Sequence, residues 1–178
     1  MRTTRRQALA AAGTASLAAA APARAADDPD RARAERALRA AVAGEQTTAV
    51  AFEAIANSDV LREDHVETMR VLLGHAKAHA AALVDLYERQ TGEDPPLPPT
   101  RTKIPGLDAL DGQRQALELA LRLQEEAIAL HLDAVRLYRN PTMLRLIAGA
   151  MGTDAQHLVM LRQLIGRRPV PEPFERGA

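Results

Sequence analysis

The sequence predicts an all-α protein whose four helices pack as one bundle. Hydrophobic residues make up 47% of the 178 residues but aromatic residues only 2%, and alanine and leucine supply most of the apolar set. This composition favours helix over sheet. Apolar residues also recur at alternating intervals of three and four in four long segments, as they do in helices that pack side by side. The length suffices for one domain with a buried core.

Helix-breaking residues set the boundaries of the four helices. The first helix ends at Asn57, and the second ends before Gly92, a residue type that suits the position just after a helix. Asn140 as the N-cap and Pro141 at the first helical position start the fourth helix. The predicted helices cover about residues 31–56, 61–90, 109–139 and 142–165. Together they form one domain over residues 26–178.

The connections between the helices predict how the bundle is wound. The first and third connections are short, so helices one and two, and helices three and four, form two antiparallel hairpins. The connection over residues 91–106 is long and proline-rich. In an extended polyproline conformation it would reach about 50 Å, whereas a helix of 25 residues is about 37 Å long. This crossover can therefore return along the whole length of the bundle.

Each helix carries a polar residue within its apolar stripe, near the middle of the helix. A buried carboxylate costs several kcal/mol unless a partner compensates its charge. Residues in the middle of neighbouring helices lie at the same height, so we expect these side chains to face one another. The sequences of the two hairpins also align as an internal repeat, in which Ala76 corresponds to Asp154. The interrupting residues are Glu45, His79, Glu125, Asp154 and His157.

This pattern resembles the ferritin-like di-metal carboxylate proteins, which use a Glu from each of two helices and Glu-x-x-His from each of the other two. The segment LHLDAVRLYRNPTMLRLIAGAMGTDAQHLVML, which begins at Leu130, is also similar to exported ferritin-like domain proteins of high-GC bacteria. The resemblance implies a ferritin-like four-helix bundle with one or two iron or manganese ions in its core. It further implies reactivity towards oxygen or peroxide. The five interrupting residues would be the metal ligands.

Two departures from the family pattern leave the function open. Ala76 stands where the second Glu-x-x-His would have its glutamate, and Asp154 replaces the longer glutamate in the other. Three acids and two histidines suit one divalent ion better than two. His75, one turn before His79, is either an additional ligand or a residue at the edge of the stripe. The alternative function is a metal-free ferritin-like scaffold or binding protein of the cell envelope, and whether the chain is an enzyme stays undecided.

The remaining polar residues predict little chemistry. His65 and His131 fall off the predicted stripes, and we expect both at the surface. Glu126 is expected to be a solvated neighbour of the site. The two serines, Ser16 and Ser58, lie in no nucleophile motif, and the chain has neither a Gly-rich phosphate loop nor a His-Glu-x-x-His zinc motif. Hydrolase chemistry is therefore not expected.

Residues 1–25 are expected to form an export signal. Four arginines and no acid accompany an alanine-rich apolar run, and Ala23-Arg24-Ala25 fits a cleavage site. The stretch that begins at Thr4 and includes Arg5 and Arg6 resembles a twin-arginine motif; an ordinary secretory signal is the alternative. We therefore expect the protein in the periplasm or elsewhere in the cell envelope, with no stable membrane insertion after cleavage.

The charge balance limits the partners. Four of the 23 basic residues lie in the predicted signal, which leaves 19 basic and 23 acidic residues in the domain. A mildly acidic domain is a poor candidate for nucleic-acid binding. We expect no nucleic acid, a possible homodimer, and a small-molecule substrate that the sequence does not identify.

Overall fold

The computed structural model describes residues 28–171, and all the regular structure in that range is helical. The long helices are α1 (Pro29–Ala56), α2 (Glu63–Thr91), α3 (Gln113–Leu137) and α4 (Pro141–Leu164). Two short 3-10 turns, η1 (Arg101–Lys103) and η2 (Leu107–Ala109), precede α3. The predicted all-α four-helix bundle is confirmed. The predicted signal at residues 1–25 lies outside the described residues, and no helix within those residues is long and apolar enough to cross a membrane.

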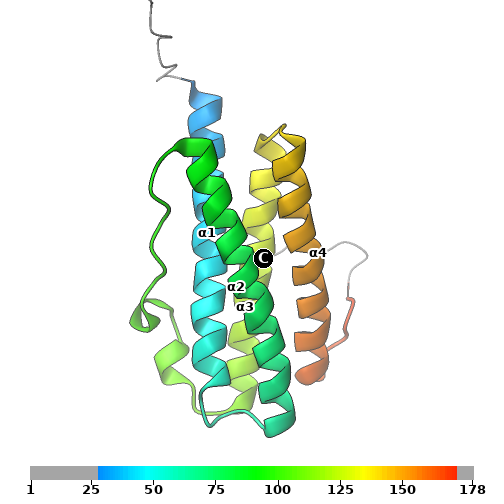
Figure 1. Cartoon of the computed structure of the whole chain (residues 1–178). Helices are drawn as coiled ribbons and strands as arrows, with labels where there is room; N and C mark the ends of the chain where they lie inside the picture. The colour runs from blue at the N-terminus through cyan, green and yellow to red at the C-terminus, as the bar shows by residue number, and fades with distance from the viewer. Residues whose placement is uncertain (1–27, 172–178) are drawn as a thin grey trace, which may run out of the picture.

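The helices form two antiparallel hairpins, α1 with α2 and α3 with α4 (Figure 1). The segment after α2 returns along the outside of the bundle to the end at which α3 begins, so α3 points the same way as α2. This crossover is attached to α1 by a 2.8 Å hydrogen bond that Gln46 Nε2 donates to Pro96 O. Its far end is buried through Ile104 and Leu107, which are 3% and 0% exposed.

Two helix ends lie at the capping residues that the sequence predicted. Asn140 Oδ1 accepts hydrogen bonds from the backbone N–H groups of Thr142 and Met143, which satisfies two of the free donors at the start of α4. Gly92 has a φ of 70° at the end of α2, a left-handed conformation that favours glycine. Most helix ends lie within two residues of the prediction, but α3 begins at Gln113 rather than near 109, because residues 107–109 form η2.

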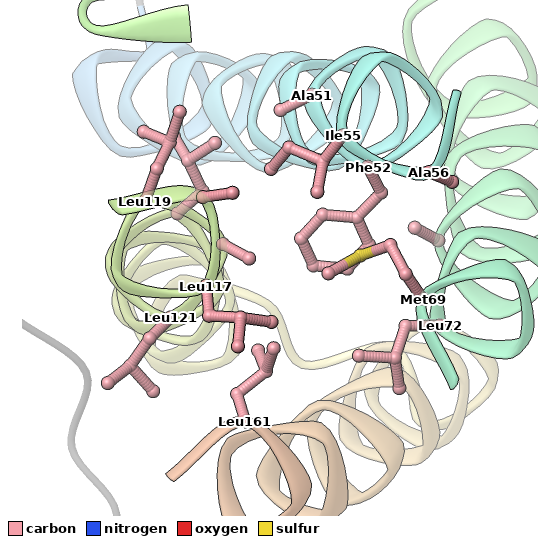
Figure 2. Packing of buried hydrophobic residues seen from close by; sticks show 14 of the residues in the cluster. Ala51, Phe52, Ile55, Ala56, Met69, Leu72, Leu117, Leu119, Leu121 and Leu161 are labelled. Atoms are coloured by element: carbon pink, nitrogen blue, oxygen red, sulfur yellow. The ribbon is translucent and has the colours of Figure 1, made fainter. Parts of the chain in front are cut away.

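The apolar core consists of two clusters, one on each side of the middle of the bundle. One cluster joins α1, α2, α3 and α4 around Phe52, Met69 and Leu161, whose packing Figure 2 shows. The other joins the same helices around Leu38 and Tyr87. Between the two clusters the chain places buried polar residues, so the apolar packing itself holds the polar side chains at one height.

Candidate metal centre

Four polar side chains, one from each helix, lie in the layer between the two apolar clusters. Glu45 of α1 and His131 of α3 are 0% exposed, and Asp154 of α4 is 1% exposed. His79 of α2 is the most accessible member, with a side chain 15% exposed. In each helix the polar residue is flanked by buried apolar residues of both clusters. The two carboxylates are therefore held well away from bulk water.

Three of these side chains converge on one point. His79 Nδ1 lies 3.3 Å from Asp154 Oδ1 and 3.7 Å from Glu45 Oε1. One donor atom from each of the three residues lies within 4.8 Å of the other two. Donors bind a small divalent cation at about 2 Å, so adjacent donors are about 3 Å apart and opposite donors about 4 Å. The three donors can therefore surround a single ion with small adjustments.

His131 lies between the two carboxylates. Its Nε2 is 3.4 Å from Glu45 Oε1, and its Nδ1 is 3.3 Å from Asp154 Oδ2. The ring thus lies in contact with one oxygen of each acid, and its two nitrogens face different carboxylates.

The buried donor atoms lack hydrogen bonds. Among the described residues, both carboxylate oxygens of Glu45 and of Asp154, both nitrogens of His131 and Nδ1 of His79 are buried without a hydrogen-bond partner. Their mutual contacts of 3.3 to 3.7 Å are longer than good hydrogen bonds. Buried polar atoms in proteins are nearly always paired. A cation in this layer would satisfy the two acids and the imidazole together, so the donor set fits a metal ion.

The burial and the charges of the layer shift its pKa values in opposite directions. Burial raises the pKa of Glu45, and the charge of Asp154 adds to this effect. Burial also opposes ionisation of Asp154, but its contacts with His131 and His79 outweigh that effect and hold the pKa well below its usual value. Burial opposes the charge of His79 as well, yet Asp154 and Glu45 raise its pKa to about 9. Without a metal, Asp154 is thus an anion beside a protonated His79.

A second group of polar side chains, none of them acidic, adjoins this layer. His157 of α4 is 1% exposed, and its Nδ1 lies 3.1 Å from Oε1 of the buried Gln124. Its Nε2 lies 2.9 Å from Nδ1 of His75, an exposed residue of α2. Burial lowers the pKa of His157 to about 4, so the ring is neutral at neutral pH. His157 Nδ1 also lies 3.7 Å from Asp154 Oδ1, which places the two groups side by side.

The chain folds as a four-helix bundle with one long crossover and carries carboxylates and histidines in the middle of the bundle. A family model described as a ferritin-like domain matches residues 33–167. The chain belongs to the ferritin-like domain family. The crystal structure of ferritin-like, diiron-carboxylate proteins from Bacillus anthracis str. Ames has a similar fold, with a TM-score of 0.65 and 19% identity over 78% of this chain and 99% of that one. A comparison with curated proteins found no match.

The sequence pattern predicted Glu125 in the core, and this prediction is wrong. The side chain is 28% exposed and pairs with Arg162, whose Nη2 lies 3.0 Å from Glu125 Oε1. The stripe of α3 that faces the core lies one position earlier and contains Leu117, Ala120, Gln124, Ala127, His131 and Ala134. Gln124 therefore occupies the buried position at which a glutamate was expected.

The same shift of stripe explains why sequence analysis missed His131. We expected this residue at the surface, but it is fully buried in the ferritin-like core. The correct stripe of α3 has intervals of 3, 4, 3, 4 and 3, as regular as the one chosen. Because α3 also buries Leu121 and Ile128, two adjacent stripes of this helix are apolar, and intervals alone do not distinguish them. The regular spacing from Leu117 to Ala134 is the sequence signal that indicates His131.

The other candidate residues lie around this centre. Glu45, His79, Asp154 and His157 come together as predicted, and His75 reaches His157 rather than the acids. Ala76 is 1% exposed and offers no donor to the layer. Glu126 is exposed and pairs with Arg122 along α3 at 3.0 Å, in line with the solvated position expected for it.

Proposed function

We propose that this ferritin-like protein binds one Fe(II) or Mn(II) ion through Glu45, His79 and Asp154. The observation that supports this proposal is the convergence of three buried donor groups that lack hydrogen bonds. Carboxylate oxygens with an imidazole nitrogen are a donor set that suits iron and manganese. His131, between the two carboxylates, would hold their spacing rather than bind the ion.

The charge of the layer favours one ion over two. Glu45 and Asp154 supply two negative charges, which balance one divalent cation. The adjoining group consists of Gln124, His157 and His75, and none of these side chains is an acid. Ala76 adds no donor either. A second divalent ion in the core would carry uncompensated charge into a buried site, which costs several kcal/mol.

The arrangement is suited to redox chemistry on a small oxidant. A bound Fe(II) or Mn(II) ion supplies one-electron chemistry with oxygen or peroxide. Three protein donors leave coordination positions free for water or a small molecule. The apolar clusters above and below exclude bulk water from the layer, and the partly exposed His79 marks the side on which the layer is nearest to solvent.

A metal-free scaffold is the second candidate function, and one observation favours it. The raised pKa of His79, about 9, gives the layer a positive charge beside Asp154. Burial raises the pKa of Glu45 and so favours its neutral acid form. The layer can therefore balance its charges by protonation alone, and such a protein would act through its surface.

Metal analysis and titration separate the two functions. We expect the protein, purified without chelator or affinity tag, to bind one Mn(II) or, anaerobically, one Fe(II) per chain. Asp154→Asn should weaken binding about 100-fold or more, because losing an outer partner of a metal ligand already costs 10–100-fold. Glu125→Gln is the matched control, since it removes a carboxylate that lies outside the centre. Failure of the native protein to bind either ion would establish the metal-free alternative.

We also propose that the protein is exported by the twin-arginine route. The proposal is supported by the sequence alone, through Arg5 and Arg6 before an alanine-rich run and the A-x-A pattern that ends at Ala25. This route exports proteins already folded, often with the cofactor in place. It would allow a metal ion to be buried in the core before the protein leaves the cytoplasm.

A further inference from the structure

His75 and His157 form an imidazole pair between α2 and α4, outside the cluster of acids. We propose that this pair is a separate metal site, which binds a cation with a preference for imidazole, Cu(II) above all, through His75 Nδ1 and His157 Nε2. The site has two imidazole donors and no acid, so it differs in kind from the acidic centre. The proposal does not depend on metal binding at Glu45, His79 and Asp154.

The first step of the argument concerns the proton of His157. Gln124 Oε1 can only accept a hydrogen bond, so His157 Nδ1, 3.1 Å away, must carry the proton. The lone pair of the ring is therefore on Nε2, the atom that faces His75. Metal-binding histidines typically donate their other ring N–H to a carbonyl or carboxylate, which fixes the tautomer and orients the ring. Gln124, which is 0% exposed, provides this support for His157.

The second step concerns the geometry of the pair. His75 Nδ1 lies 2.9 Å from His157 Nε2, and the ring centroids are 5.2 Å apart with planes 9° from parallel. These values describe two rings joined end to end by an N–H···N bond, in which His75 is the donor. The two nitrogens therefore share one proton and face each other directly.

A metal ion can take the place of this shared proton. With nitrogen–metal bonds of about 2 Å, the two nitrogens would separate to about 3.3 Å at a tetrahedral angle and about 4 Å in a linear arrangement. His157 is fixed by burial, but the exposed His75 can make this movement by rotating its side chain. The proton of His75 moves to its Nε2, so binding needs no net loss of a proton from the pair. Water completes the coordination on the exposed side.

The choice of cation follows from the donors. Two imidazoles offer no negative charge to a hard ion such as Mn(II). Imidazole suits copper, nickel and zinc, and affinity for divalent ions at nitrogen donors is greatest for Cu(II). We therefore expect the two sites to differ in selectivity, with Cu(II) at the imidazole pair and Fe(II) or Mn(II) at the buried acids.

The proposal is tested with Cu(II) alone, added to the full chain and followed by titration and by electron paramagnetic resonance. The native protein should show a site with two imidazole nitrogens. His75→Ala should weaken that site at least tenfold, and because His75 is exposed this variant should fold normally. His65→Ala is the matched control, since His65 is another histidine of α2 that takes no part in the pair. Unchanged Cu(II) affinity in His75→Ala would overturn the proposal.

Two further variants separate this site from the acidic centre. Gln124→Leu removes the support of His157 Nδ1 and should weaken Cu(II) binding about 10–100-fold, as loss of an outer partner does. Glu45→Gln should abolish Mn(II) binding but leave the two-imidazole Cu(II) signal in place. A Cu(II) signal lost in Glu45→Gln would show that copper binds at the acids, and the pair would then not be a site. If the native protein binds no Mn(II) but gives the two-imidazole Cu(II) signal, only the function proposed for the acids is refuted.

Discussion

At the scale of single residues, the polar layer of Glu45, His79, His131 and Asp154 holds ionisable groups where bulk water is excluded. Two buried carboxylates cannot both ionise without a cation. In the metal-free protein that cation is His79, whose raised pKa gives stability that is present in full below its usual value of 6.5 and lost as pH rises through about 9. Asp154, with a lowered pKa, contributes stability above its usual value of 3.8 and loses it in acid.

The protonation of His79 predicts how metal binding depends on pH. A metal ion binds the deprotonated ring, so below a pKa of about 9 each bound ion must displace one proton from His79. The Mn(II) affinity should therefore rise at least about tenfold for each pH unit between about pH 6.5 and pH 8.5, because any proton held by the buried Glu45 must leave as well. Calorimetric titration in buffers of different ionisation enthalpy measures both the affinity and the proton release.

The control for this experiment is the same titration with Glu125→Gln, which should show the same slope because Glu125 lies outside the centre. An Mn(II) affinity that does not change with pH over this range would contradict the assignment of His79 as a ligand.

At the scale of elements, α3 has two apolar stripes, so the spacing of its apolar residues does not identify which face of the helix is buried in the core. One residue is about 100° around a helix, so Gln124 and Glu125 point in clearly different directions. Both candidate stripes of α3 contain buried leucine, isoleucine or alanine. The choice between them depends on where α1 and α4 pack, which no interval within α3 determines.

The crossover is the element that closes the bundle, and its attachment predicts a measurable loss of stability. Leu107 in η2 is 0% exposed and belongs to the same apolar cluster as Phe52 and Leu161. Leu107→Ala should lower the free energy of unfolding by about 2–5 kcal/mol, the usual cost of emptying a buried leucine site. Urea denaturation followed by circular dichroism gives this value.

Leu97 in the same crossover is the matched control, because its side chain is 87% exposed. Leu97→Ala should change the free energy of unfolding by no more than about 0.5 kcal/mol. Equal losses in the two variants would mean that η2 does not anchor the crossover to the core.

At the scale of the whole molecule, the polar layer is held from both sides by apolar packing. The two clusters contain residues of all four helices, and the layer between them contains one residue from each. Shifting any helix by one residue would therefore move both its apolar and its polar side chains out of place. The stability of the bundle and the geometry of the centre thus depend on the same packing.

The proposed export also belongs to the molecule as a whole, since the twin-arginine route transports folded proteins. We expect the chain recovered from the periplasm to begin at Ala26, as measured by intact mass. Arg5→Lys with Arg6→Lys should keep the protein in the cytoplasm, whereas the control Arg2→Lys should not. Normal export of the double variant would indicate an ordinary secretory signal, and a full-length exported chain would show that the signal is not cleaved.

The sequence by itself determined the class of fold, the two hairpins and the crossover, because these depend on local signals. Intervals of three and four, the cap at Asn140, the glycine at 92 and the proline-rich segment each act within a few residues of the chain. The central, buried positions of Glu45, Asp154 and His157, and the position of His79 beside them, were also predictable, because each residue interrupts an apolar stripe near the middle of its helix.

Only the tertiary structure decided which residues of α3 complete the centre. In the structure Gln124 and His131 lie in the core and Glu125 does not, because the packing of α3 against α1 and α4 selects one of two apolar stripes. It also separated the polar core into a part with two acids and a part with none, and it placed His75 against His157 instead of against the acids. These contacts link residues that lie far apart in the chain, so no local pattern specifies them.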